Sequence, residues 1–140
     1  MNPGARRAVA AASAWLLAGI FLFAGLEKWL QPGAFADAIA DYRLLPGAWV
    51  NLAAVLIPAW EIAAALALLV PGWRRSGALI ILGLCAVFFA AVVSALARGL
   101  DIDCGCFGPL ARRADWMTLL LDLALGACAL YLAKPSRGGT

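Results

Sequence analysis

The sequence has no histidine and few charged residues. Of its 140 residues, 14% are charged and 65% are hydrophobic. Histidine is the usual general base near neutral pH and a common metal ligand, so its absence argues against most hydrolases and metalloenzymes. So little charge beside so much apolar surface is typical of a membrane protein. The net charge of +3 is better explained by membrane topology than by nucleic acid, so the bilayer is the first expected partner.

Long apolar runs make up most of the chain. A transmembrane helix needs about 20 mostly apolar residues, and four such runs lie at about residues 8–29, 47–70, 77–97 and 116–133. Proline and glycine separate several of them, as expected at helix ends. We therefore expect one all-α domain over residues 1–140, a bundle of four transmembrane helices.

The first run follows Arg6 and Arg7, a pattern that also describes a secretory signal peptide. A signal peptide would end at a small-x-small cleavage site. The far end of this run reads Phe23-Ala24-Gly25-Leu26-Glu27 and contains no such site. The sequence therefore favours an uncleaved first span.

Residues 32–46, between the first two runs, predict a short helix that does not cross the membrane. Phe35, Ile39 and Tyr42 recur at spacings of four and three residues, which places them on one narrow apolar stripe. Two aspartates and an arginine share the segment. We expect an amphipathic surface helix that lies across the mouth of the bundle and shields what is beneath it.

Lysine and arginine near span ends predict the orientation. The amino end, the connector at 71–76 and the tail after residue 133 each carry two of them and lie on one side of the membrane. The other two connectors, on the opposite side, also contain basic residues. They make the difference in lysine and arginine between the two sides smaller but do not reverse it. We therefore expect a bacterial-type inner-membrane protein with both termini cytoplasmic. The segment between the last two spans would then be periplasmic, where disulfides persist.

That segment contains the sequence Cys104-Gly105-Cys106-Phe107-Gly108. Cysteines one residue apart lie near the limit of disulfide reach, and Gly105 permits the bend that a bond between them needs. Such a disulfide would be strained and easily exchanged. The plain alternatives are a static disulfide, which adds little stability across so short a loop, or two unpaired thiols. A closed zinc site is disfavoured because histidine and a second cysteine pair are missing.

Three charged residues stand out for their depth or position: Lys28 near the end of the first span, and Glu61 and Asp122 inside the second and fourth. A carboxylate at membrane depth costs at least ~2–3 kcal/mol and normally faces the bundle interior. Helical spacing puts Glu61 on one inward face with Asn51 and Pro58. We expect the three charged side chains to line a polar cavity that opens toward the two cysteines. Within it Glu61 is protonated, pairs with Lys28 or relays protons; the alternative is a purely structural ion pair.

The other two cysteines, Cys85 and Cys128, lie inside apolar runs. Buried cysteine usually behaves as a small hydrophobic residue. We predict no redox role for either.

Several short motifs extend from the first run to the cysteine segment. They are Gly25-Leu26-Glu27-Lys28, Tyr42-Arg43-Leu44-Leu45-Pro46, Pro58-Ala59-Trp60-Glu61, and Arg98-Gly99 followed by Cys104-Gly105-Cys106-Phe107-Gly108. In this order the chain resembles the methylamine utilisation protein MauE family, a branch of the DoxX-like membrane proteins. The resemblance covers about residues 15–133, and the cysteine motif is its specific part.

The resemblance implies a four-helix membrane protein that helps methylamine dehydrogenase to mature. Disulfide delivery or isomerisation beside a thioredoxin-like partner would be its role. Quinone-linked disulfide enzymes of the DsbB and vitamin K epoxide reductase type are also four-helix bundles, but they use Cys-x-x-Cys. That motif is absent here, which argues against a quinone, and no other cofactor is indicated.

The leading hypothesis is a membrane thiol–disulfide oxidoreductase in which Cys104 or Cys106 exchanges disulfides with a cysteine-containing periplasmic protein. Lys28, Glu61 and Asp122 would support the site. Tyr42, Gly105, Phe107 and Gly108 would shape or shield it. A second hypothesis is a non-catalytic assembly factor or scaffold for a periplasmic partner. A third is a small-ligand or metal binder that uses the intramembrane carboxylates.

Overall fold

The computed structural model describes residues 2–100 and 116–134. These residues form helices and no strand. In chain order the elements are α1 (Pro3–Leu30), α2 (Pro32–Asp41), α3 (Gly47–Leu69), the 3-10 turn η1 (Pro71–Trp73), α4 (Arg74–Ala97) and α5 (Trp116–Ala133). The predicted all-α architecture, with a short helix between the first two long ones, is confirmed.

Local chemistry accounts for the helix ends. α1 begins at Pro3, ahead of the apolar run, because the Asn2 side chain accepts a hydrogen bond from the amide of Ala5 at 2.7 Å. α2 also begins with a proline, a residue whose fixed φ suits the first helical position. It stops before Arg43, whose positive φ of 55° is incompatible with a continuing right-handed helix.

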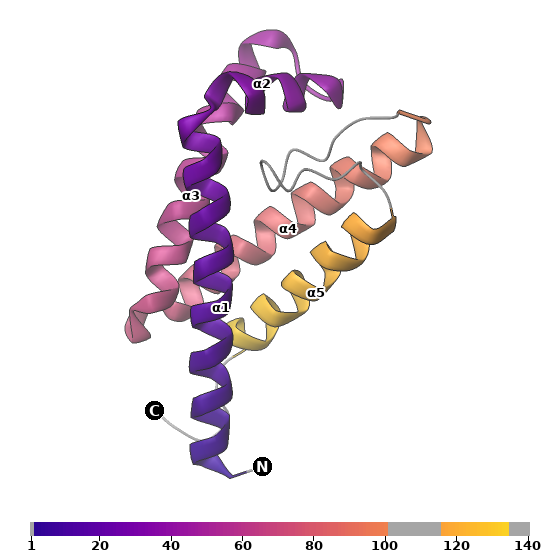
Figure 1. The fold of residues 1–140 in the computed structure, drawn as a ribbon. Coiled ribbons are helices and arrows are strands. Elements are labelled where there is room, and N and C mark those ends of the chain that lie inside the picture. The colour runs from indigo at the N-terminus through magenta and orange to yellow at the C-terminus, as the bar shows by residue number, and fades with distance from the viewer. Residues whose placement is uncertain (1, 101–115, 135–140) are drawn as a thin grey trace.

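Figure 1 shows the four long helices as two antiparallel pairs. α1 packs mainly on α3, and α4 packs mainly on α5. The pairs cross obliquely and are joined chiefly by α3 against α4. α2 lies across one end of α1 and α3, and the start of α1 and the end of α5 lie toward the other end. We call these the α2 end and the η1 end of the bundle.

The outer surfaces of the long helices are apolar. Trp15, Leu56 and Leu120 are among many large hydrophobic side chains that are exposed on the bundle. A soluble protein rarely exposes apolar surface so extensively, whereas lipid matches it. Four helices within the described ranges are long and apolar enough to cross a bilayer. The protein is therefore a multi-pass membrane protein whose outer surface contacts lipid.

The η1 end is packed through small residues. A Cβ atom added at Gly77 of α4 would lie 2.7 Å from the carbonyl oxygen of Ala64 in α3. Glycine therefore lets the two backbones approach closely. The guanidinium of Arg75 also donates from Nε to the carbonyl oxygen of Ala133, at 3.1 Å, and so ties α4 to the end of α5.

The α2 end is held by a different contact. Arg98, the residue after α4, donates through Nη2 to the backbone carbonyl of Tyr42 at the end of α2. Its Nε also donates to the carbonyl oxygen of Ser94 at 3.3 Å. Phe35 and Tyr42 are buried beneath α2, as the predicted apolar stripe requires.

Candidate functional site

A buried ion pair between α1 and α3 is the centre of the site. The ammonium group of Lys28 lies 3.0 Å from Oε1 and 3.1 Å from Oε2 of Glu61. Only 2% of each side chain is accessible. Both charges are thus removed from water and from lipid, and their mutual attraction offsets the cost of burying them.

Two aromatic rings complete the surroundings of Lys28. Its Nζ lies 5.4 Å from the ring centroid of Phe35 in α2 and 5.7 Å from that of Phe88 in α4. Both distances fall in the range of cation–π attraction, which strengthens when water is excluded. Residues from four helices, α1 to α4, therefore meet at one ammonium group.

Close packing of α1 on α3 brings the two charged side chains within contact distance. Lys28 lies one helical turn after Gly25 in α1. A Cβ atom at Gly25 would lie 3.2 Å from the carbonyl oxygen of Pro58 and 3.3 Å from Cβ of Glu61. The missing side chain lets α1 approach α3 at the depth of Glu61.

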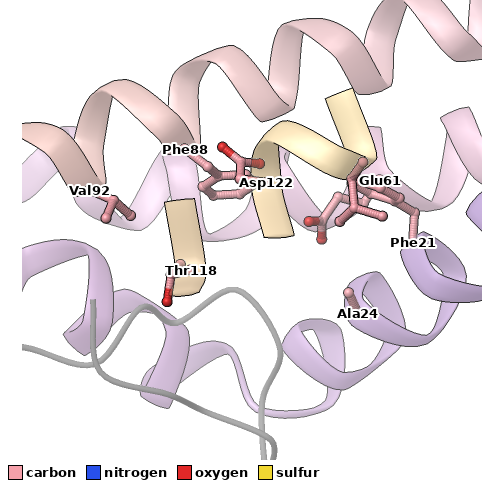
Figure 2. Close-up of a pocket in the computed structure, with 8 residues that line it drawn as sticks. Phe21, Ala24, Glu61, Phe88, Val92, Thr118 and Asp122 are labelled. Carbon is pink, nitrogen blue, oxygen red and sulfur yellow. The ribbon is translucent and has the colours of Figure 1, made fainter. Parts of the chain in front are cut away.

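A small cavity lies beside Glu61 (Figure 2). It has a volume of about 20 Å³, which is room for about one water molecule. Glu61 reaches it from α3, and Thr118 and Asp122 reach it from α5. The remaining wall is apolar and includes Phe88. Polar groups from two helix pairs therefore share one small enclosed space.

Asp122 is the less satisfied of the two carboxylates. Its Oδ2 is buried and has no hydrogen-bond partner among the described residues. The side chain interacts with the buried thiol of Cys85 on the neighbouring α4. A buried carboxylate oxygen without a partner is costly and rare, so such a group is a functional candidate.

The structure places the predicted site residues unevenly. It brings Lys28 and Glu61 into contact and puts Asp122 on the cavity that Glu61 lines. Tyr42 ends α2 and is buried. The predicted inward position of Asn51 is wrong: it is exposed near the start of α3, whereas Pro58 and Glu61 are buried.

The cysteine motif lies outside the described residues. That applies to Cys104, Gly105, Cys106, Phe107 and Gly108, so their predicted roles stay predictions. Of the other two cysteines, Cys85 is buried and Cys128 is partly buried, and both are free thiols. Within residues 2–100 and 116–134, no three potential ligands cluster as a metal site would require.

Sequence reasoning missed two contributors to the site. Phe88 and Cys85 stand in an apolar run of α4, where nothing distinguishes them from lipid-facing neighbours. Their roles depend on how α4 is rotated against α1 and α5. Gly25 carried a usable signal, because a small residue one turn before a buried lysine marks a close helix contact.

Comparison with known proteins gives one consistent result. A family model described as "Methylamine utilisation protein MauE" matches residues 6–134. A curated relative, the methylamine utilization protein MauE of Paracoccus denitrificans, is 34% identical over 85 residues. That match covers 59% of this chain and 46% of the relative, so it spans about half of the relative's length. No solved structure matches.

Proposed function

The chain belongs to the methylamine utilisation protein MauE family, and from this premise we propose that it serves methylamine utilisation by exchanging disulfides with a periplasmic protein. Cys104 and Cys106 would carry the exchange. The maturing enzyme's disulfide-rich subunit, or a thioredoxin-like protein that acts on it, is the partner that the family resemblance implies.

The position of the polar cavity carries the proposal. α4 ends at Ala97 and α5 begins at Trp116, so the cysteine segment connects these two helix ends. Thr118 and Asp122, in the first two turns of α5, line the cavity that also receives Glu61. Two carboxylates, Asp122 on α5 itself and Glu61 on the same cavity, therefore lie near the start of the helix that follows the cysteine segment.

The exchange is balanced within two proteins. A thiolate of the partner attacks one sulfur of the Cys104–Cys106 disulfide, which forms an intermolecular disulfide and releases the other cysteine as a thiolate. The partner's second thiolate then attacks the intermolecular bond. The partner gains a disulfide, while Cys104 and Cys106 gain two electrons and take up two protons. The reverse sequence would deliver a dithiol to the partner.

Glu61 and Asp122 would handle the protons of this exchange. A thiol must lose its proton to attack, and a leaving thiolate is stabilised when a proton reaches it. Asp122 has a buried oxygen that is free of protein partners within the described residues, and it shares a cavity wall with Glu61. Lys28 would hold Glu61 in place through its two contacts.

Thiol trapping in membrane vesicles tests the proposal. Vesicles are equilibrated at a series of redox potentials, quenched with an alkylating reagent and analysed by mass spectrometry. Two alkylation sites should appear together as the potential falls, and they should map to Cys104 and Cys106. The variant Cys128→Ser should show the same transition, because Cys128 neither exchanges disulfides nor belongs to the site.

A Cys104→Ser/Cys106→Ser variant should abolish the transition and the partner's redox change. The proposal fails if the pair keeps one oxidation state at all potentials, or if the partner's disulfides form normally beside the double serine variant. Of the two single-serine variants, the one that keeps the cysteine that bonds to the partner should accumulate the mixed disulfide, and the other should not form it. The comparison identifies the cysteine that bonds to the partner.

A second candidate is a non-catalytic assembly factor. The Lys28–Glu61 pair favours it, because a buried ion pair that joins α1 to α3 can serve to hold the two helices together without any part in catalysis. In that case the double serine variant would keep full function in the cell. Replacing exposed residues of the α2 end would instead weaken partner binding.

A further inference from the structure

A second, larger cavity lies between α2, α3 and α4. Its volume is about 400 Å³, within the range of small-molecule sites. It is separated from the ion pair by Phe35 and Phe88, whose rings line the cavity and also contact Lys28. Nothing in the thiol exchange proposed above uses this space.

The residues that line this larger cavity favour an apolar, hydrocarbon ligand. Among the described lining residues, only Tyr42 and Ser94 have polar side chains, and none is charged. A polar metabolite or an ion would lose its hydration in this cavity without gaining partners. A flexible apolar chain would instead replace a void that close-packed protein interiors rarely contain.

The cavity borders the lipid-facing surface. Val87 of α4 and Leu44 of the α2–α3 connector line it and are also exposed on the outside of the bundle. Both belong to a surface that contacts lipid in a multi-pass membrane protein. A chain can therefore enter from the bilayer without crossing water.

Two exposed arginines lie at one end of the cavity, where the exposed Asp41 also adjoins Tyr42. Arg98 is exposed, and its guanidinium donates to the carbonyl oxygens of Tyr42 and Ser94, two residues that line the cavity. Arg43 is also exposed and lies in the chain between Tyr42 and Leu44, which also lines the cavity. Arginine pairs readily with phosphate oxygens.

We propose that this cavity is a binding site for one anionic phospholipid. One acyl chain occupies the space between α2, α3 and α4, and the phosphate group lies at Arg98 and Arg43. The acyl chain then packs against Phe35 and Phe88, the rings that enclose Lys28. Bound lipid therefore holds α2 over the buried ion pair.

Native mass spectrometry of the purified full chain tests this site. The chain, delipidated in detergent, is titrated with phosphatidylglycerol or with phosphatidylcholine of the same acyl chains. One phosphatidylglycerol should bind with clear preference. Arg98→Gln and Arg43→Gln should each weaken it about fivefold, since one interfacial arginine contributes that much toward an anionic lipid. Arg7→Gln, an exposed arginine in the first turns of α1, should change nothing.

A cavity-filling variant separates chain burial from surface attraction. Ala91→Phe places a ring in the cavity and should remove the tight phosphatidylglycerol site, while its unfolding midpoint in lipid-free detergent stays near that of the wild type. If it does not fold, Ala53→Leu gives a milder filling from α3. Phosphatidylglycerol binding that survives filling would overturn the acyl-chain site. Equal binding of both lipids would overturn the role of the arginines.

Discussion

The two ends of this bundle are built differently. At the η1 end, α3 and α4 are in backbone contact at Gly77, and small buried residues such as Ala14, Ala64 and Ala129 fill the core. Toward the α2 end the helix pairs diverge. The ion pair lies there between α1 and α3, with the small cavity beside it, and the larger cavity lies between α2, α3 and α4. The η1 end is therefore closely packed, whereas the α2 end contains charges and open space.

The difference shows how a small membrane protein divides its tasks. Packing of small residues needs no polar group and tolerates lipid all round. A site for proton chemistry needs charges and space, and both are costly inside a membrane. Placing them at one end, beneath α2, lets the other end supply the stability that the site lacks.

Removing one member of the ion pair should have the largest effect. Glu61→Ala leaves the Lys28 ammonium buried without its carboxylate, and we expect a loss of about 3–5 kcal/mol in the free energy of unfolding. Unfolding by sodium dodecyl sulfate in mixed micelles measures it. Glu27→Gln, a neighbouring acid that is only partly buried, should stay within about 0.5 kcal/mol.

The double variant Lys28→Met/Glu61→Leu sharpens this comparison. Replacing both charges by apolar side chains removes the desolvation cost together with the attraction, so stability should return close to that of the wild type. The proposed disulfide exchange should not return. Full activity in a stable double variant would show that the ion pair serves only the fold.

Much of the fold could be predicted because apolar length and helical period are local properties. Four long runs gave four helices, and the stripe of Phe35 and Tyr42 gave the surface helix. A pair of Lys28 with Glu61 is one of three alternatives that the sequence leaves open, because a charge buried in a membrane needs a partner, and the structure shows this one.

The remaining features depend on how each helix is rotated and placed against its neighbours, which the spacing of apolar residues along one segment does not determine. Asn51 lies near the edge of the helical face that Glu61 centres and is exposed, whereas Val50 and Ala54 at the same level of α3 are buried. Cys85 and Phe88 lie on a helix that is apolar all round, so only tertiary packing decides which residues face Asp122 and Lys28. The larger cavity arises from the divergence of α3 and α4, which no single segment encodes.

Adding a side chain at the close contact between α3 and α4 at the η1 end should lower stability less than removing a charge of the ion pair. A side chain at Gly77 meets backbone atoms of Ala64 and Leu68 at 2.7 and 3.0 Å, and backbone cannot move aside as a flexible side chain can. Gly77→Ala should therefore cost about 1–3 kcal/mol by overpacking. The same detergent unfolding measures it.

Gly83→Ala is the matched control in the same helix. A Cβ atom there meets nothing within 4 Å, and alanine favours a helix interior over glycine by up to about 1 kcal/mol. This variant should be neutral or slightly more stable. Equal stabilities for the two alanine variants would contradict the tight contact between α3 and α4.

The smallest effect should come from the tie between α4 and α5. Arg75→Gln removes a cationic donor from the carbonyl of Ala133, in the last turn of α5, where positive charge is favourable. Because Arg75 is exposed, the loss should be only about 0.3–1 kcal/mol. Hydrogen exchange should show it more clearly than global unfolding, as faster exchange confined to the last turn of α5. Arg7→Gln should leave that turn unchanged, and faster exchange at the α2 end instead would mean that the two ends are not independent.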